Sequence, residues 1–343
     1  MLIIKLLNRV ESLNLNLSGR VVLTEAATGP YVVTPILAAL AGAKVFAYCK
    51  SSRYGTAAQV IEKTRNVYRS YRRPLDINFI EELTPEVIAK ADIITNSGHL
   101  RPLNKEKLQH AKDSVVIPLM YEAWEWRDED MDIDYVRERR FKIGATNERH
   151  CEIDVFNYLG DMAVKQIFDA GLCLYKNKFI LICNNDFGPY IAKVLGRMCK
   201  RIGIIDLVEN KEKYSGENVE WIGNFPEVAI PEHFRDAEAV IFTAYPFDKT
   251  WIGEDAVIKV NTLKSNLDHP LILRYAGDVD TEALIEKGVR YFPEFVTSGH
   301  MGVLPSAIGF DPIIRLQAGG LKVGEALLSG NYNHLDTPLL DLV

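Results

Sequence analysis

The residue best suited to acid–base chemistry is His300, in the loop Ser298–Gly302 (SGHMG) near the end of the chain. An imidazole titrates close to neutral pH, so it can take the proton of an alcohol or return one to a ketone. The glycines beside it let the backbone approach a ligand closely. We therefore expect His300 to be the acid–base residue of a hydride transfer between an alcohol and a ketone; the alternative is a structural or exposed loop histidine.

A second segment has the position of a nucleotide-binding loop. Cys183–Pro189 follows an apolar run and precedes a helical pattern, where a G-x-G-x-x-G loop holds a pyrophosphate in dinucleotide-binding proteins. If Gly188 is the third glycine, Cys183 and Asn185 take the places of the first two, and asparagine tolerates positive φ. Asp186, however, would bring a negative charge towards the pyrophosphate. The predicted cofactor is NAD; the alternative is a scaffold that has lost its hold on the dinucleotide.

The predicted cofactor contacts extend beyond this loop. Glu209 follows the next apolar run, where a carboxylate can accept hydrogen bonds from ribose hydroxyls and disfavours a 2′-phosphate. Thr243 ends a later apolar run, and Asn261 lies in the segment Val260–Ser265. The complete predicted set is Asn184, Asn185, Asp186, Phe187, Gly188, Glu209, Thr243 and Asn261.

Two segments in the first half of the chain could bind a substrate. Met120–Arg127 (MYEAWEWR) follows one apolar run, and Ser97–Arg101 (SGHLR) follows another. The aromatic, acidic and basic side chains of the first segment suit a larger, partly apolar molecule better than a two-carbon acid; the alternative is that its aromatic rings pack against the inter-domain helix. The second segment could add a cation to the same cleft. The predicted substrate contacts are His99, Arg101, Tyr121, Glu122 and Trp124.

The elements that must position these residues follow from the order of apolar runs. Short β-rich runs alternate with helical patterns, which is typical of parallel α/β units. Ligands bind at the carboxyl ends of such strands. The expected strands are Arg20–Thr24, Lys44–Tyr48, Ile93–Thr95, Val115–Leu119, Lys142–Ala145, Phe179–Cys183, Ile204–Val208, Ala239–Thr243, Val257–Val260 and Leu271–Tyr275.

The two halves of the chain repeat each other. Gly29–Val32 (GPYV) follows the first expected strand, and Gly188–Ile191 (GPYI) follows the first expected strand of the second half. A long helical pattern closes each half, over Asp154–Ala170 and Pro305–Ser329. The predicted fold is therefore α/β, with two Rossmann-like, doubly wound domains, a cleft between them and two crossing helices that join them.

The composition is that of a globular protein and excludes several functions. The 343 residues, 48% hydrophobic with a net charge of −6, suit two domains, for which we expect 1–150 plus 305–343 (substrate) and 151–304 (NAD(P)-binding). We expect no nucleic-acid partner, because no basic cluster is large enough. The longest apolar stretch is broken by Pro, Gly and Lys, so we expect no membrane span, and no ligand spacing predicts a metal. Five cysteines without a C-x-x-C pair indicate buried thiols in a reducing cytoplasm.

Several short stretches resemble the D-2-hydroxyacid dehydrogenase family, also called the formate/glycerate dehydrogenase family. Asp132–Arg140 resembles its D-x-x-x-A-R-E-R-G-I helix, Val260–Ser265 its N-T-x-R-G signature and Val296–Gly302 its T-P-H-x-G signature. The resemblance implies an NAD-dependent oxidoreductase that transfers a hydride between the nicotinamide and a hydroxy or keto acid. It also implies a homodimer that binds a small-molecule substrate.

The same resemblance implies partners for the histidine. In that family an arginine holds the substrate's carboxylate and carbonyl, and an acidic residue supports the histidine. Lys264 takes the arginine's position; it keeps the charge but lacks the planar, two-pronged guanidinium. Asp278 and Asp280 are substitutes for the acidic residue, or else ordinary acids at a helix start. The predicted catalytic residues are His300, Lys264 and Asp280.

Two other functions stay open. The N-terminal part resembles S-adenosylhomocysteine hydrolase over Ser18–Val22 (SGRVV), Thr34–Ala43 (TPILAALAGA) and Lys44–Ser52 (KVFAYCKSS), which implies a hydrolase or lyase with tightly held NAD. The other is a binding or regulatory protein that keeps the scaffold without the cofactor. The loop at 183–188 discriminates between these functions, because only the enzymes need it to hold a dinucleotide.

Overall fold

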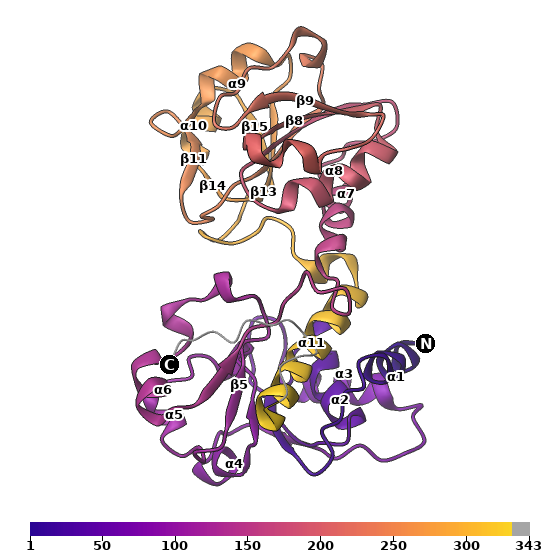
Figure 1. Ribbon diagram of the computed structural model, residues 1–343, viewed down its shortest axis with the longest axis vertical. Coiled ribbons are helices and arrows are strands. Elements are labelled where there is room, and N and C mark those ends of the chain that lie inside the picture. The colour runs from indigo at the N-terminus through magenta and orange to yellow at the C-terminus, as the bar shows by residue number, and fades with distance from the viewer. Residues whose placement is uncertain (331–343) are drawn as a thin grey trace. The chain divides into compact units, whose positions relative to one another are not determined.

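The computed structural model describes residues 1–330, and the chain divides into two compact units. Among the described residues, unit 1 holds Met1–Val155 and Gly309–Gly330, whereas unit 2 holds Phe156–Ile308. Each unit contains its own parallel sheet and its own helices (Figure 1).

Unit 1 is built on six parallel strands in the order β3-β2-β1-β4-β5-β6. The strands are β1 (Val21–Glu25), β2 (Lys44–Tyr48), β3 (Ile77–Ile80), β4 (Ile93–Ile94), β5 (Val116–Pro118) and β6 (Lys142–Gly144). The chain first builds the sheet outward from β1 in one direction, then returns to β1 and builds it in the other. This is the strand order of dinucleotide-binding sheets.

Helices cover both faces of the unit 1 sheet (Figure 1). They are α1 (Leu2–Ser12), α2 (Val33–Leu40), α3 (Ala57–Tyr68), α4 (Pro85–Lys90), α5 (Lys105–Leu108), α6 (Ile133–Arg139) and α11 (Asp311–Ser329). Val22 and Ile93 pack in the core with α1, α2, α3 and α11. Their neighbours in sequence, Leu23 and Ile94, pack in the opposite core with α4, α5 and α6. Successive side chains of a strand point to opposite faces, so these apolar runs are buried on both sides.

The last described helix, α11, returns to unit 1 and packs along α2, β5 and β6. Glycines allow this close approach. A Cβ on Gly320 would lie 2.4 Å from the Met120 sulfur, and one on Gly324 would lie 3.0 Å from the Ile93 side chain. Larger residues at these positions would push the helix away from the sheet.

Unit 2 repeats this architecture with the order β15-β13-β10-β7-β8-β9 and adds a small sheet, β12-β11-β14. Its strands are β7 (Lys178–Cys183), β8 (Arg201–Asp206), β9 (Val219–Asn224), β10 (Ala239–Thr243), β11 (Thr250–Gly253), β12 (Ile258–Lys259), β13 (Leu271–Ala276), β14 (Asp278–Val279) and β15 (Arg290–Phe292). Its helices are α7 (Leu159–Asp169), α8 (Phe187–Met198), α9 (Val260–Asn266) and α10 (Thr281–Glu286). In chain order, the large sheet runs sixth-fifth-fourth-first-second-third, the same as unit 1 read from the other side.

The two sheets confirm the predicted fold of two Rossmann-like domains. Most expected strands lie in the two large sheets. The expected strand Val257–Val260 does not, because it corresponds to β12, which belongs to the small sheet. The expected strand Ile204–Val208 also ends too late, because β8 stops at Asp206. The Asp206 carboxylate accepts a hydrogen bond from the N–H of Leu207 at 2.6 Å, and the chain then turns into a short helical segment over Val208–Lys213.

The strands that sequence reasoning missed lie at the sheet edges or in the small sheet. β3, β9 and β15 are only partly buried along most of their length, so their residues do not form apolar runs. An edge strand needs less apolar surface than a central one, because it has one neighbour and more solvent.

Two further expectations can be compared with the structure. Within residues 1–330, no helix is both long and apolar enough to cross a membrane. The five cysteines form no disulfide, and Cys49, Cys183 and Cys199 are buried, but Cys151 and Cys173 are exposed. The expectation of burial is therefore wrong for these two, which lie in a turn and in a loop after α7 rather than in core elements.

Candidate functional site

In both units the strand order reverses beside the first strand, and ligands of open α/β sheets bind outside the carboxyl ends of the strands at that point. In unit 1 the loops concerned follow β1 and β4, and in unit 2 they follow β7 and β10. Most predicted site residues lie on these and the adjoining loops. We call these regions the unit 1 edge (residues 25–31, 95–101, 119–130 and 145–149) and the unit 2 edge (183–188, 206–214, 243–248, 276–280 and 298–300).

At the unit 2 edge, the loop after β7 is fixed by its own asparagines. The Asn184 amide accepts from the N–H of Tyr245 at 2.7 Å and donates to its carbonyl oxygen at 3.1 Å. Asn185 donates to the Thr243 hydroxyl at 3.0 Å and accepts from the N–H of Phe187, also at 3.0 Å. The structure thus brings together four predicted cofactor contacts, and their amides hold the loop against the end of β10.

The carboxylate that ends β8 is Asp206, which is fully buried. It accepts hydrogen bonds from the N–H of Leu207 at 2.6 Å, from the Asn210 amide at 3.3 Å and from the Tyr214 hydroxyl. Burial raises the pKa of Asp206, although these hydrogen bonds oppose the shift. The predicted ribose acceptor Glu209 is instead exposed in the turn after the strand. The expected strand end at Val208, directly before Glu209, is wrong because β8 stops at Asp206.

Gly188 makes room for the Tyr214 hydroxyl. A Cβ on Gly188 would lie 2.0 Å from that oxygen and 2.9 Å from the Cys183 sulfur. In dinucleotide-binding sheets, a carboxylate at the end of the second strand accepts a hydrogen bond from a ribose hydroxyl. Here the Tyr214 hydroxyl makes the same kind of hydrogen bond to Asp206. The Asp206 carboxylate is therefore suited to bind a ribose hydroxyl, and in this structure the Tyr214 hydroxyl occupies that position.

The His300 loop is anchored by Asp278. Its carboxylate accepts from the Ser298 hydroxyl at 2.5 Å and from the N–H of Gly299 at 3.3 Å. Gly299 has φ +72°, which glycine adopts without strain. The His300 Nδ1 lies 3.0 Å from the Ser298 carbonyl oxygen. Asp280 does not join this network in the described contacts: its carboxylate accepts from the N–H of Ala283 at 2.9 Å and caps α10.

The loop 244–248 connects the His300 loop to the cofactor loop. The Phe247 ring lies 5.8 Å from that of Phe187, and the Phe247 carbonyl accepts from the N–H of Asp278 at 2.9 Å. A Cβ on Gly299 would contact Asp248 at 3.5 Å. The His300 loop and the loop after β7 therefore belong to one continuous edge. Lys264 and Asn261, by contrast, are exposed on α9, which follows the small sheet.

At the unit 1 edge, Glu25 holds the loop after β4. Its carboxylate accepts from the N–H of His99 at 3.0 Å and lies 3.8 Å from the imidazole Nε2. The backbone of Gly98 provides the space, since a Cβ there would lie 1.6 Å from the carboxylate. Burial raises the pKa of Glu25, and the N–H of His99 opposes the shift.

Arg101 and Tyr121 form a second group at this edge. The Arg101 guanidinium donates to Asp130 at 2.9 Å and lies over the Tyr121 ring, 5.8 Å from its centre. The Tyr121 hydroxyl lies 3.3 Å from the same carboxylate and accepts from the Asn96 amide at 2.7 Å. Arg101 and Tyr121, both predicted to bind the substrate, therefore pack against each other.

Glu122 is the centre of a third group and is almost fully buried. Its carboxylate accepts from Arg149 at 2.6 Å, from the N–H of Glu148 at 3.0 Å and from the Trp124 indole. Trp124 therefore lies against Glu122, as part of this network. These donors satisfy the Glu122 carboxylate, as is typical of a buried polar group in a folded protein.

Glu125 and Glu148 adjoin this group: the Glu125 carboxylate accepts from the N–H of Glu122 at 3.3 Å, and the N–H of Glu148 donates to the Glu122 carboxylate at 3.0 Å. Burial raises the pKa of Glu125 to about 7. Burial, and then the charges of Glu125 and Glu122, raise the pKa of Glu148 well above its ordinary value. Burial also raises the pKa of Tyr31 to about 12, with the charges of Glu148 and Glu125 adding to the shift. Burial therefore favours the neutral form of both carboxyls.

Sequence reasoning missed Glu125, Glu148 and Tyr31 at the unit 1 edge, and Asp206 and Tyr214 at the unit 2 edge. Position relative to strand ends could have found the first two, because Glu125 lies in the MYEAWEWR segment and Glu148 follows β6. Asp206 was hidden inside an expected strand. No local pattern marks Tyr214, whose hydroxyl reaches Asp206 from eight residues away in sequence.

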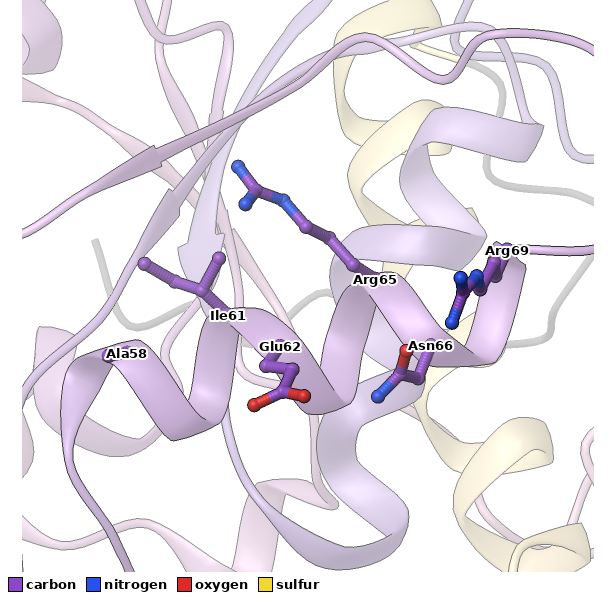
Figure 2. A pocket seen from close by; sticks show the side chains of 6 residues that line it. All are labelled: Ala58, Ile61, Glu62, Arg65, Asn66 and Arg69. Atoms are coloured by element: carbon purple, nitrogen blue, oxygen red, sulfur yellow. The ribbon is translucent and has the colours of Figure 1, made fainter.

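A separate hollow lies on the exposed side of α3 (Figure 2). Its described lining consists of Ala58, Ile61, Glu62, Arg65, Asn66 and Arg69. These residues recur every three or four positions, so they form one face of a single helix and its C-cap. None of them belongs to either edge, and we do not assign the hollow a role.

Comparisons with known proteins extend the fold assignment. The chain is similar to crystal structures of dipicolinate synthase from Bacillus subtilis (13% identity, TM-score 0.59) and from Bacillus halodurans (11% identity, TM-score 0.56). Each match covers 92% of this chain and 99% of the dipicolinate synthase chain. No protein-family model matches the chain, and no curated protein matches its sequence. At this identity the likeness defines a shared two-domain fold, the one that the dehydrogenase resemblance implied.

Proposed function

We propose that the chain is an oxidoreductase that transfers a hydride between a nicotinamide cofactor and a hydroxy or keto acid. The observation that carries this proposal is the continuity of the unit 2 edge. There a nucleotide-type loop, a carboxylate at the end of the second strand and the His300 loop adjoin one another on a sheet with dinucleotide-binding order. The stretches that resemble D-2-hydroxyacid dehydrogenases support the same assignment.

NAD is the proposed cofactor, and when bound it supplies the hydride acceptor or donor. Asp206 would accept a hydrogen bond from a ribose hydroxyl once the Tyr214 side chain moves out, and its charge disfavours a 2′-phosphate. The Asp186 carboxylate is exposed at the start of α8, 3.6 Å from the Lys213 ammonium, which offsets its charge near a pyrophosphate. Asn184 and Asn185 keep the loop in place rather than hold the cofactor through their side chains.

His300 is the proposed acid–base residue. Its Nδ1 donates to the Ser298 carbonyl, so proton exchange with a substrate hydroxyl falls to Nε2. Asp278 positions the imidazole through the backbone of its loop. Catalytic roles for Lys264 and Asp280 stay predictions, as do substrate contacts from His99, Arg101, Tyr121, Glu122 and Trp124 across an inter-domain cleft.

The test has two parts. NAD should raise the melting temperature, because a ligand that binds only the folded state stabilises it, by about 2.7 kcal/mol at a hundred times Kd. Oxidation of NADH with a series of 2-keto acids should then detect turnover, and His300→Ala should abolish turnover while it spares the NAD shift. The absence of a shift with millimolar NAD and NADP would contradict the proposal, and full turnover in the variant would remove His300 from its role.

A second candidate is a binding or regulatory protein that uses the same scaffold without a cofactor. One observation favours it: the donors around Asp206 all come from the chain itself, so the ribose position is satisfied without a ligand. The same NAD titration separates the two candidates, because only the oxidoreductase requires binding.

A homodimer and a cytoplasmic location also stay predictions. The first rests on the dehydrogenase resemblance, and the second on the cysteine spacing. Sedimentation equilibrium at micromolar concentration tests the homodimer, and a mass of one chain would contradict it.

A further inference from the structure

Arg274 is a buried charged residue that has no part in the proposed function. It lies on β13, and only 5% of it is exposed. Its guanidinium lies 3.8 Å from the Asp278 carboxylate, whereas its Nε has no hydrogen-bond partner among the residues that the structure describes. Burying a guanidinium costs stability unless its charge and its donors are satisfied. Stability alone therefore does not explain an arginine at this position.

The Asp278 carboxylate divides its contacts between the His300 loop and Arg274. It accepts hydrogen bonds from the Ser298 hydroxyl at 2.5 Å and from the N–H of Gly299 at 3.3 Å. The guanidinium stands farther away, at 3.8 Å, and leaves the oxygens to these two donors. Asp278 is only 8% exposed, and a nearby positive charge favours the charged form of a buried carboxyl. Arg274 therefore supplies the charge, and the loop supplies the hydrogen bonds.

The backbone of the same strand holds the far end of the loop. The carbonyl oxygen of Tyr275 accepts from the N–H of Gly302 at 2.9 Å. Gly302 also approaches the carbonyl oxygen of Arg274 so closely that a Cβ there would lie 1.8 Å away. The Gln166 amide, on α7, donates to the same carbonyl at 2.8 Å. Both ends of the His300 loop are therefore held by the end of β13 and its continuation to Asp278.

The two buried charges depend on each other. Burial lowers the pKa of Arg274, and the charge of Asp278 opposes this shift. Charges about 4 Å apart attract each other more strongly in the protein interior than in water. If either charge is removed, the other stays buried without compensation, which is strongly destabilising for the surrounding structure. The disturbance should reach the His300 loop, because Ser298 and Gly299 are bonded to Asp278.

We propose that Arg274 is a positioning residue for His300. Its guanidinium compensates the buried Asp278 carboxylate, and the charged carboxylate fixes Ser298 and Gly299 directly before the imidazole. This extension rests on the proposed function, in which His300 exchanges the proton. In this role Arg274 neither contacts the substrate nor transfers a proton.

The imidazole signal of His300 in NMR spectra of the full chain tests the proposal without nucleotide or substrate. His300→Ala identifies the signal, because it is the one that this variant lacks. Arg274→Met removes the charge and keeps much of the side chain's length, so it should shift or broaden the His300 signal. Arg201→Met, at an exposed arginine of the same unit that is paired with Glu220 at 3.1 Å, should leave the signal unchanged.

Two further variants separate charge from packing. Arg274→Lys keeps the positive charge, and at 3.8 Å the charge matters more than the planar shape of the guanidinium, so the His300 signal should stay near its place in the unaltered chain. Asp278→Asn removes the negative charge with little change of shape and should move the signal as Arg274→Met does. If Arg274→Met fails to fold, Arg274→Gln takes its place.

Turnover of NADH with a 2-keto acid gives a second measurement. Arg274→Met should lower kcat about tenfold or more and leave KM for NADH within about threefold, because His300 is displaced while the loop after β7 is not. In the Asp278→Asn background, Arg274→Met should lower kcat by less than about threefold, because the two changes disrupt the same charge pair.

Two results would overturn the proposal: a His300 signal that Arg274→Met and Asp278→Asn both leave unchanged, or equal displacement of that signal by Arg274→Met and Arg274→Lys. Its failure is distinct from that of the proposed function, because the NMR measurement needs no nucleotide. A signal that follows the charge in a chain without turnover would support the positioning role and reject the oxidoreductase. Turnover that requires His300 but is undiminished in Arg274→Met would do the reverse.

Discussion

The unit 1 edge and the unit 2 edge share a strand order but differ in how their buried carboxyl groups are satisfied. Asp206 is surrounded by donors from its own chain, one of which is the Tyr214 hydroxyl. At the unit 1 edge, the Glu125 carboxylate accepts from the N–H of Glu122 at 3.3 Å, and burial raises the pKa of both Glu125 and Glu148. The same topology can therefore prepare an edge for different ligands. An edge filled by a hydroxyl suits a ligand that brings hydroxyls, whereas burial at the unit 1 edge favours the neutral form of its carboxyls.

The largest expected effect concerns Glu122, which holds the unit 1 edge together. Glu122→Ala should lower the free energy of unfolding by about 3 kcal/mol, because it leaves a guanidinium and two N–H donors without this acceptor. Urea denaturation measures the effect. Glu129→Ala, the exposed control, should stay within about 0.5 kcal/mol of the unaltered chain. An equal loss in both variants would contradict the account of this network.

The second-largest expected effect is a pH dependence of stability that arises at the unit 1 edge. Burial raises the pKa of Glu125 from 4.5 to about 7, so the folded state binds more protons than the unfolded state between these values. Its contribution to stability therefore falls as pH rises from about 4.5 to 7, by about 2 kcal/mol. Glu125→Gln should remove this fall, as measured by urea denaturation at pH 5 and pH 7.5. The same slope in both proteins would refute the raised pKa.

At the unit 2 edge, Gly188 and Tyr214 should be coupled. Gly188→Ala places a Cβ 2.0 Å from the Tyr214 hydroxyl and should cost about 2 kcal/mol of stability. Tyr214→Phe removes that oxygen, so the double variant should lose less than the sum of the two single variants, by about 1 kcal/mol. Strict additivity in denaturation experiments would show that the two residues do not meet.

The smallest expected effect separates the two aspartates near His300. Asp280→Ala should cost about 1 kcal/mol through loss of the α10 cap and reduce turnover less than Asp278→Ala does. Asp278→Ala should reduce turnover, because the His300 loop loses its anchor. Unfolding curves and initial rates measure both. A larger loss of turnover from Asp280→Ala would restore the role that the dehydrogenase resemblance gave it.

The sequence was sufficient for the fold because the central strands are buried on both faces, and such strands appear as apolar runs. The paired GPYV and GPYI segments then indicated the duplication. The chemistry of the edges was only partly accessible. Glu122 lies in the loop after β5 and His300 in the loop that follows β15, but the partners of Asp206 depend on where one strand ends and on a tyrosine that returns from a later turn. Burial and contacts of this kind arise from tertiary packing, which local patterns do not encode.

Calorimetric titration of NAD into the unaltered chain, Tyr214→Phe and Asp206→Asn tests most directly whether the unit 2 edge holds a ribose in place of a tyrosine. Our account predicts that NAD binds the unaltered chain, binds Tyr214→Phe about tenfold more tightly because the competing hydroxyl is gone, and binds Asp206→Asn at least about tenfold more weakly. Equal affinities in all three proteins, or no binding to any of them, would contradict it.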